Sequence, residues 1–407
     1  MKFLILVPDG CADWKIPALD GKTPLEAAGI DNINALAKKS EIGLARTIPE
    51  GVEPGSDAAN LSILGFDPSD CLTGRAPLEA IAAGIKLSVD DIAFRANFVT
   101  LRAENENDSY DDLIIESHSA GEITEEESAE LIAFLNEKLA TDDIRFYTGI
   151  SYRCAMVTEK FGAGCELRAP HDFLTQKTRD ALPTGIGAEK IETLMRRSYE
   201  ILKNHPINLK RREKNLLPAN AIWFWGQGKK PNLPSFREKF GVDGSVITAV
   251  NLIRGIGICL GLSVTDVPGA NGTVNTNYEG KARAAIDEFS RGKDFVFLHF
   301  EAPDECSHGG NLSDKLRSLK HFDDKIFAPI HEFLAGCGEP FRILIISDHF
   351  TPLEIRRHTD EPVPFVLFDS EKILPHDDSK FFSEASAKNG KFFSDGVEIA
   401  EYFFRRT

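Results

Sequence analysis

Three aspartates follow apolar segments of the chain at points where β-strands would end. The segments and the aspartates after them are 3–7 with Asp9, 295–300 with Asp304, and 342–346 with Asp348. In an open α/β sheet, the carboxyl ends of the strands form the edge at which ligands bind. We therefore expect the three carboxylates to lie together at one edge of a sheet.

Three histidines accompany these aspartates, and they are His308, His349 and His358. A single such residue is most often a cap or turn residue, but three aspartates and three histidines at one edge suffice for two divalent metal ions. Mixed imidazole and carboxylate ligands favour manganese, zinc or cobalt over magnesium, because Mg²⁺ prefers oxygen ligands. We expect most of the remaining histidines to be structural or exposed, namely His118, His171, His205, His299, His321, His331 and His376.

Ser56 lies in the segment Pro54-Gly-Ser-Asp57, where a helix is expected to begin. An N-cap serine is the simple explanation. The functional alternative is a nucleophile, because the free amides of a helix N-terminus favour a phosphate and a bound metal ion lowers the pKa of a hydroxyl. No G-x-S-x-G motif surrounds Ser56, so activation by a metal ion is the more economical route.

Several other polar side chains could bind an anionic substrate. Arg75 and Arg95 could each hold a phosphate or carboxylate through two hydrogen bonds, although a surface salt bridge explains them equally well. Lys281 opens an expected helix and could reach into a cleft, although a solvent-exposed lysine is the simpler interpretation. Further candidates, which structural hydrogen bonding explains at least as well, are Arg153, His171, Asp172 and Arg254.

Short apolar runs that end in Gly, Pro or Asp and lead into helical patterns predict an α/β fold with a mostly parallel sheet flanked by helices. The clearest strands are 3–7, 295–300, 342–346 and 364–368, with helices at 280–289 and 312–327. The middle of the chain has its own helix and strands, at 122–138, 94–101, 146–148, 221–225 and 245–250. We therefore expect residues 1–88 and 269–407 to form one domain, and residues 89–268 to form an inserted α+β domain.

The amino-acid composition limits the classes of partner that the chain can bind. The 407 residues include 47 Lys and Arg against 63 Asp and Glu, and the net charge of −16 disfavours binding to nucleic acid or an anionic membrane. No apolar run approaches the ~18 residues of a membrane span, and the run 3–7 is too short for a signal segment. The seven cysteines form no C-x-x-C pair, so we expect free thiols in a reducing cytoplasm. An oligomer is compatible with this composition.

Motifs along nearly the whole chain resemble those of one family. They are Pro8-Asp-Gly10, Pro54-Gly-Ser-Asp57, Ile63-Leu-Gly-Phe-Asp-Pro68, Thr73-Gly-Arg-Ala-Pro-Leu-Glu79, Asn277-Tyr-Glu-Gly-Lys281, Glu301-Ala-Pro-Asp-Glu305, Asp348-His349 and His358-Thr359. These motifs are similar to those of the archaeal-type, 2,3-bisphosphoglycerate-independent phosphoglycerate mutases of the alkaline phosphatase superfamily. The resemblance implies an alkaline-phosphatase-like core and a metal-dependent interconversion of 2-phosphoglycerate and 3-phosphoglycerate, a step of glycolysis and gluconeogenesis.

The resemblance also implies roles for particular residues. The ligands of the two metal ions are implied to be Asp304, His308 and His358 for one ion, and Asp9, Ser56, Asp348 and His349 for the other. Ser56 is implied to take the phosphoryl group from one hydroxyl of phosphoglycerate and to return it to the other through a phosphoserine, without 2,3-bisphosphoglycerate as a cofactor. Lys281 is the second catalytic candidate. The inserted domain could bind substrate and act as a lid that keeps water from the phosphoserine.

Some positions leave other activities open. Phe350 stands where the family pattern has a small polar residue, and Arg254 and Asn271 also depart from the pattern. The segment Trp223-Phe-Trp-Gly-Gln227 resembles a bacterial branch proposed to phosphorylate homoserine, and a metal-dependent phosphatase is another alternative. A sulfatase would need a C/S-x-P-x-R context, which Ser56 lacks. A catalytically silent binding protein on this fold would have lost a ligand or the nucleophile, and none is lost.

Overall fold

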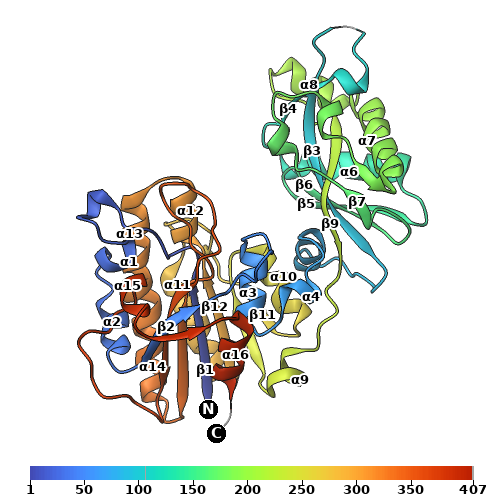
Figure 1. Cartoon of the computed structure of the whole chain (residues 1–407). Helices are drawn as coiled ribbons and strands as arrows, with labels where there is room; N and C mark the ends of the chain where they lie inside the picture. Colours follow the sequence, from blue (N-terminus) through green and yellow to red (C-terminus); the bar gives the residue numbers. More distant parts are fainter. Residues whose placement is uncertain (106, 406–407) are drawn as a thin grey trace. The chain divides into compact units, whose positions relative to one another are not determined.

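Both ends of the sequence build the first of two structural units (Figure 1). The structure, a computed structural model, describes residues 1–105 and 107–405. Unit 1 comprises Met1–Leu72 and Leu233–Thr407, and unit 2 comprises Thr73–Asn232. Because the chain leaves unit 1 and later returns to it, unit 2 is an insertion into the sequence of unit 1.

A sheet of eight strands forms the centre of unit 1. In spatial order they are β11 (Ser263–Thr265), β10 (Gly244–Ile247), β12 (Phe295–Phe300), β1 (Lys2–Pro8), β13 (Phe341–Ile346), β14 (Val363–Asp369), β2 (Glu41–Ala45) and β15 (Lys391–Phe393). Neighbouring strands pair in parallel except at β14, which is antiparallel to both β13 and β2. The mostly parallel sheet predicted from the sequence is therefore confirmed, with its four clearest strands as β1, β12, β13 and β14.

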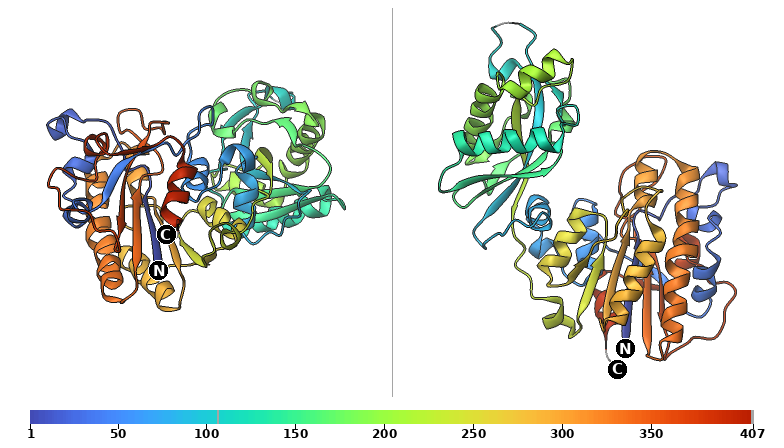
Figure 2. Two further views of the ribbon diagram at one scale, coloured as in Figure 1. Left: turned by 60° about the horizontal axis from the view of Figure 1, so that its bottom comes forward. Right: turned by 180° about the vertical axis from the view of Figure 1, so that it is seen from behind.

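Helices cover both faces of this sheet (Figures 1 and 2). One layer contains α2 (Asp31–Ala37), α11 (Tyr278–Ser290), α13 (Leu312–His321) and α14 (Ala328–Gly336), and the other contains α3 (Ser56–Ile63), α10 (Asn251–Cys259) and α16 (Gly396–Phe404). The alternation of side chains along β1 explains the two layers. Leu4 and Leu6 pack into the core of the first layer. Phe3 points the other way, with its ring centroid 5.6 Å from that of Phe403 and 5.1 Å from that of Phe404.

The helix expected at 312–327 is longer and less regular than its pattern indicates. It begins as α13 and widens into a π-helical segment at Phe322–Phe327 before α14. Asp323 in this segment accepts hydrogen bonds from the backbone N–H groups of Ile33 (2.8 Å) and Asn32 (3.1 Å), and thereby caps the start of α2. The short helices of unit 1 are α1 (Pro24–Ala27), α4 (Pro68–Cys71), α9 (Phe236–Phe240), α12 (Ala302–His308) and α15 (Glu384–Ala387).

Unit 2 is built around a separate antiparallel sheet. Its strands are β3 (Ile92–Arg102), β4 (Ile114–Ser117), β5 (Ile144–Ile150), β6 (Arg153–Thr158) and β9 (Ala221–Lys229), beside a hairpin of β7 (Gly164–Glu166) and β8 (Thr184–Ile186). Its helices are α5 (Ala76–Ala82), α6 (Glu125–Leu139), α7 (Ala188–Leu202) and α8 (Pro206–Glu213). The fully buried side chains of Phe94, Trp223 and Phe224 lie in its core. Unit 2 therefore has the α+β character expected from the sequence.

The boundaries between the units differ from those expected at 88/89 and 268/269. Residues before position 89 already belong to unit 2, because α5 packs against β3 and β9. The strand expected at 245–250 was assigned to the insertion, and this assignment is wrong. It is β10, which pairs with β12 of unit 1 through Val246 and Phe297. The segment β10–α10–β11 is a parallel β-α-β crossover, so both of its strands extend the large sheet.

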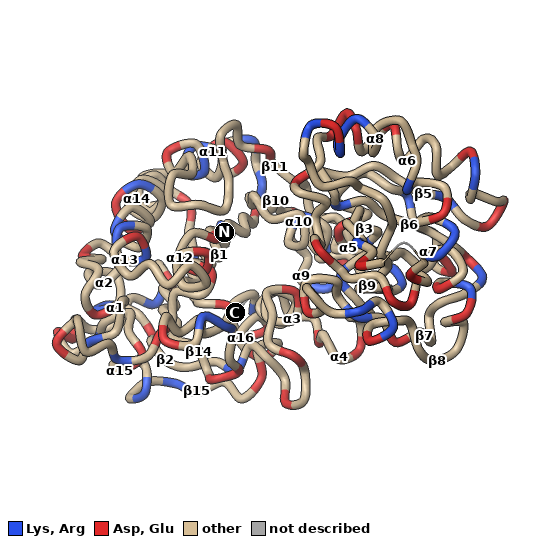
Figure 3. Tube along the Cα trace, turned by 90° about the horizontal axis from the view of Figure 1, so that it is seen from above, with Lys and Arg blue, Asp and Glu red and all other residues tan. Residues whose placement is uncertain are grey.

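Charged residues of both signs are interspersed along the trace of each unit (Figure 3). A site for an anion must therefore be local rather than a broad basic surface. No disulfide joins the seven cysteines, all of which lie among the described residues. Among the described residues, the helices are too short or too polar to span a membrane.

A buried network of charged side chains connects distant segments of unit 1. Lys315 Nζ lies 2.8 Å from Asp13 Oδ2, and both side chains are excluded from solvent. The carboxylate of Glu384 accepts hydrogen bonds from the Asp13 backbone N–H (2.9 Å) and from the Thr23 hydroxyl (2.6 Å). Burial raises the pKa of Glu384 to about 7. The folded protein therefore binds this proton more tightly than the unfolded chain does.

This raised pKa predicts a pH-dependent loss of stability. The contribution of protonated Glu384 is complete below its ordinary pKa of 4.5 and is lost as the pH rises through about 7. We expect the free energy of unfolding to decrease across this window in the wild type and to decrease less in Glu384→Gln. Urea unfolding at about pH 5 and about pH 8 measures both slopes. The exposed Glu371→Gln variant is the control, and equal slopes in wild type and Glu384→Gln would contradict the prediction.

Candidate active site

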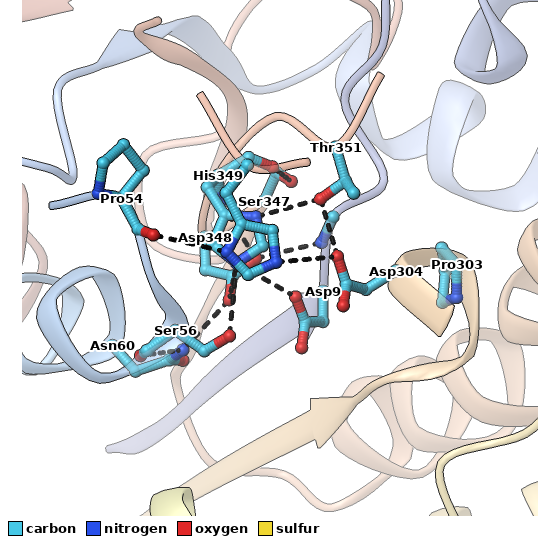
Figure 4. Close-up of polar contacts among 12 residues, drawn as sticks. Asp9, Pro54, Ser56, Asn60, Pro303, Asp304, Ser347, Asp348, His349 and Thr351 are labelled. Atoms are coloured by element: carbon cyan, nitrogen blue, oxygen red, sulfur yellow. Dashed lines mark hydrogen bonds and ion pairs between the residues drawn. The ribbon is translucent and has the colours of Figure 1, made fainter. Parts of the chain in front are cut away.

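The carboxyl ends of three adjacent strands position the predicted aspartates. The strands β12, β1 and β13 are neighbours and run in parallel, so their ends lie at the same edge of the sheet. Asp9 follows β1, Asp348 follows β13, and Asp304 lies in the first turn of α12, directly after β12. The three carboxylates are brought together as expected, and all three are almost fully buried (Figure 4).

Ser56 is the first residue of α3 and faces this cluster. Its Oγ lies 3.2 Å from Nε2 of His349. The N-cap of α3 is Gly55 rather than Ser56, so the explanation of Ser56 as a capping serine is wrong. Asn60, one turn further along α3, donates one hydrogen bond to the carbonyl oxygen of Ser56 (2.8 Å) and another to Oδ2 of Asp348 (3.1 Å). The start of α3 is thereby tied to the carboxylate edge (Figure 4).

Asp304, His308 and His358 form one group of metal-binding type. The Nε2 atoms of the two histidines are 2.9 Å apart, and they lie 3.1 Å and 3.5 Å from the two Asp304 oxygens. The Nδ1 atoms lie near backbone carbonyl oxygens, at 2.9 Å from Arg356 and 3.4 Å from Pro54. A carbonyl only accepts hydrogen bonds, so each imidazole carries a proton on Nδ1, and Nε2 is the nitrogen whose lone pair would face a bound cation. Two lone pairs and a carboxylate that converge in this way fit a divalent cation.

Asp9 lies at the centre of two further groups of metal-binding type, Asp9–Asp304–His349 and Asp9–His299–Asp348. Its Oδ1 is 3.5 Å from Nε2 of His349 and has no hydrogen-bond partner among the described residues. Burial, together with the nearby Asp348 and Asp304 carboxylates, raises the pKa of Asp9 well above its usual range. A bound cation removes this repulsion, so the donor set and its charge also fit a divalent metal ion here.

His299 belongs to this site although its sequence context did not indicate it. It is fully buried on β12, and its Nε2 lies 3.2 Å from Oδ2 of Asp9. Burial lowers the pKa of His299 to about 4, so the imidazole is neutral. The register of the sheet places His299 in the site, because His299 pairs with Val7, two residues before Asp9. The sequence shows no pairing of strands, so His299 was grouped with the structural histidines.

Lys281 is buried beside the same strand end, so its interpretation as an exposed helix-surface lysine is wrong. Its Nζ donates a hydrogen bond to the carbonyl oxygen of His299 (3.0 Å). Burial lowers the pKa of Lys281 to about 8, against the opposing effect of Glu301. Burial and the nearby acidic residues raise the pKa of Glu301 to about 7. The edge of the sheet thus contains a buried lysine whose pKa is closer to neutral pH than that of an exposed lysine.

The substrate-binding candidates of unit 2 form a cluster of their own. Arg95 makes a salt bridge with Glu79 (3.0 Å), and its guanidinium lies 4.0 Å from the ring centroid of Trp225. The ring of His171 is 5.2 Å from the same Trp225 ring. Burial and the positive charges of Arg75 and Arg153 nearby lower the pKa of Arg95. These positively charged side chains beside the Trp225 ring are suited to binding a small anion.

Three other candidates have simpler surroundings. Arg153 is exposed and donates a hydrogen bond from Nε to the hydroxyl of Tyr152 (3.1 Å). Asp172 is exposed, 3.8 Å from Nε2 of His171. Arg254 does not belong to the inserted unit, contrary to expectation. It lies on α10 of unit 1 and pairs with Asp266, because the β10–α10–β11 crossover belongs to the large sheet.

The fold and the site define a class of enzyme. A hydroxyl at a helix N-terminus, beside buried carboxylates and imidazoles that fit cations, can attack a phosphoryl group and hold it. Such a site at the carboxyl edge of an α/β sheet is that of a phosphotransfer enzyme with groups of side chains that could hold metal ions.

Comparison with known proteins identifies the family within this class. Residues 37–208 match the family model of 2,3-bisphosphoglycerate-independent phosphoglycerate mutase. The chain is 44% identical, over 100% of both chains, to a probable 2,3-bisphosphoglycerate-independent phosphoglycerate mutase of Geobacter sulfurreducens. It is 44% identical, over 96% of both chains, to the 2,3-bisphosphoglycerate-independent phosphoglycerate mutase of Methanothrix thermoacetophila. The solved cofactor-independent phosphoglycerate mutase from Thermoplasma acidophilum is 25% identical, with a TM-score of 0.66 over 99% of this chain and 98% of that one.

The chain therefore belongs to the 2,3-bisphosphoglycerate-independent phosphoglycerate mutases, which are isomerases that interconvert 2-phosphoglycerate and 3-phosphoglycerate.

Proposed function

We propose that Ser56 accepts the phosphoryl group of phosphoglycerate and returns it to the other hydroxyl, through a phosphoserine. The observation that supports this role best is the 3.2 Å distance between Ser56 Oγ and His349 Nε2 at the N-terminus of α3. At this position the first backbone N–H groups of α3 face the incoming phosphate. The serine is also free of a capping role, so its hydroxyl is available for attack.

We further propose two divalent metal ions at this edge, with manganese preferred and cobalt, zinc or magnesium as alternatives. Asp304, His308 and His358 would hold one ion, and the residues that would hold the other are Asp9, Ser56, Asp348 and His349. Bound divalent ions lower the pKa of a nearby hydroxyl and offset the charge of phosphoryl oxygens. The imidazole ligands suit manganese, cobalt or zinc better than magnesium, which prefers oxygen ligands.

The remaining residues of the edge hold the nucleophile and neutralise charge. Asn60 fixes the Ser56 carbonyl relative to Asp348, which orients the first turn of α3. Lys281, with its lowered pKa of about 8, is positioned to exchange a proton near neutral pH, which supports its role as the second catalytic residue. The cysteines, which form no disulfide among the described residues, support a reducing, cytoplasmic environment for this reaction.

The arginine cluster of unit 2 is proposed to bind the anionic groups of the substrate. Its members are Arg75, Arg95, Arg153 and His171, with Asp172 at its edge. A mutase must keep the glyceryl group bound while phosphate resides on the serine, because water otherwise hydrolyses the phosphoserine. Residues that hold the substrate carboxylate therefore determine whether the reaction ends as isomerisation or as hydrolysis.

Arg153→Ala tests whether these residues determine the ratio of hydrolysis to isomerisation. We expect the ratio of phosphoglycerate hydrolysis to isomerisation to increase several-fold, because the acceptor is held less firmly while Ser56 still takes the phosphate. Released inorganic phosphate and the 2-phosphoglycerate formed from 3-phosphoglycerate give the two rates. Arg145→Ala, an exposed arginine of β5, is the control. An unchanged ratio with unchanged activity would remove Arg153 from the substrate site.

A parallel assay tests the activity against its alternatives. The protein loaded with Mn²⁺ is given 3-phosphoglycerate in one reaction and ATP with homoserine in another. We expect 2-phosphoglycerate in the first and no phosphohomoserine in the second. Phe350, the departure that suggested another substrate, is buried, and its backbone bridges to Ala12 and Thr359. The departure from the family pattern at Phe350 therefore affects the packing of the protein interior. Phosphohomoserine without 2-phosphoglycerate would overturn the proposed role of this chain.

A further inference from the structure

The hydroxyl of Thr351 lies between the two groups of proposed metal ligands. Thr351 is fully buried and is assigned no role in the proposed mechanism. Its Oγ1 donates a hydrogen bond to Oδ1 of Asp304 (2.6 Å) and lies 3.1 Å from Nδ1 of His349. In the proposed assignment Asp304 is a ligand of the first ion and His349 of the second, and Figure 4 draws the contacts of Thr351 with both residues.

The single proton of this hydroxyl determines the direction of both hydrogen bonds. An ionised carboxylate only accepts hydrogen bonds, so the 2.6 Å contact places the Thr351 proton toward Asp304. Oγ1 is then an acceptor toward His349, and Nδ1 of His349 must be the protonated nitrogen. The lone pair of Nε2 therefore faces Ser56 Oγ, 3.2 Å away, where it can accept the serine proton or bind a cation.

His308 and His358, the two histidines grouped with Asp304, are oriented by a different kind of acceptor. Nδ1 of His308 and of His358 lie near backbone carbonyl oxygens, which have no proton to give. A threonine hydroxyl can donate or accept, and here its proton is already committed to Asp304. The choice of the protonated nitrogen of His349 thus depends on the contact of Thr351 with Asp304.

The fold holds Thr351 firmly in this position. Its backbone N–H donates to the carbonyl oxygen of Ala12 (3.2 Å), and its carbonyl oxygen accepts a hydrogen bond from the buried Nζ of Lys315 (3.1 Å). Gly10 leaves the necessary space, because a Cβ there would lie 2.5 Å from Thr351 Oγ1 and 2.6 Å from Asp304 Oδ1. The φ of +57° at Gly10 also favours glycine.

We propose that Thr351 is a positioning residue that holds His349 as the Nδ1–H tautomer and couples the two metal-ligand groups. The assignment of these groups to two ions rests on the proposed function, whereas the tautomer of His349 does not. Partners of this kind, which orient metal ligands without touching the ion, typically contribute roughly 10- to 100-fold in metal affinity. Loss of the Thr351 hydroxyl should therefore lower the affinity of the protein for both ions.

The first experiment reads the tautomer in the metal-free, full-length protein. Side-chain ¹⁵N NMR of histidine-labelled protein gives the protonated nitrogen, and the signal lost in His349→Gln identifies His349. We expect the Nδ1–H form in the wild type and in Thr351→Ser, and loss of that form in Thr351→Val. An Nε2–H form in the wild type, or an unchanged signal in Thr351→Val, would overturn the proposal.

The second experiment measures binding of Co²⁺ alone by calorimetry. We expect roughly 10- to 100-fold weaker binding of both ions in Thr351→Val and recovery to within a few-fold in Thr351→Ser. An unchanged affinity for both ions, or a lower affinity for only one of them, would refute the coupling. If Thr351→Val does not fold, as judged by urea unfolding, Thr351→Ala takes its place. These results do not depend on turnover, so they stand or fall separately from the role of Ser56.

Discussion

Ser56→Ala should lower mutase turnover by several orders of magnitude while the protein remains folded. The substitution removes the only atom of this side chain that can receive the phosphoryl group, and no neighbouring hydroxyl replaces it in the proposed mechanism. Ser56 is not the cap of α3, so the free energy of unfolding should change by less than the ~1 kcal/mol that loss of a capping serine costs. The isomerisation rate and urea unfolding measure the two effects.

A second serine provides the matched control for this experiment. Ser235 is a true N-cap, and it forms a capping box with Glu238 at the start of α9. Ser235→Ala should lose about 1 kcal/mol of stability and keep its activity, which is the reverse of the result expected for Ser56→Ala. After rapid acid quenching of the wild type with substrate, mass spectrometry should locate phosphate on Ser56. Near-normal mutase activity in folded Ser56→Ala would show direct transfer or a different nucleophile.

The parts of the site that follow a strand end could be predicted from the sequence. A short apolar run followed by Asp identifies a buried strand and its carboxyl end, and parallel strands bring these ends to one edge. Asp9, Asp304 and Asp348 are found together for this reason. The same reasoning placed Ser56 near a helix start, but it could not distinguish the cap position from the first helical residue, because they differ by one position.

Other features depend on tertiary contacts that a single sequence does not show. His299 lies within an apolar strand, and only its pairing with β1 brings it to Asp9. Lys281 was expected on a helix surface, but the α11 face that contains it packs against β12. The strands β10 and β11, at one end of the sheet, are only four and three residues long, so their membership of the large sheet was not evident. Each of these cases was decided by which elements pack together.

Removal of divalent metal ions should abolish turnover, and Mn²⁺ or Co²⁺ should restore it. Asp9, Asp304 and Asp348 are buried within one cluster, and burial together with the charges of Asp348 and Asp304 raises the pKa of Asp9. Without a cation this negative charge opposes the approach of a phosphorylated substrate and leaves the Ser56 hydroxyl at its ordinary, weakly acidic pKa. The metal-free protein should also unfold at a lower temperature, because ions that bind only the folded state stabilise it.

A pair of histidine variants makes this prediction specific to the site. His358→Gln removes one imidazole whose Nε2 lies 3.5 Å from Asp304, so more Mn²⁺ should be needed for half-maximal activity and for the gain in melting temperature. His376→Gln, at an exposed histidine that contacts Asp378, should reactivate like the wild type. The metal content of each preparation is measured before the assay. Full turnover by a protein shown to contain no divalent metal would refute the metal dependence, and identical reactivation of the two variants would place the required ion away from Asp304.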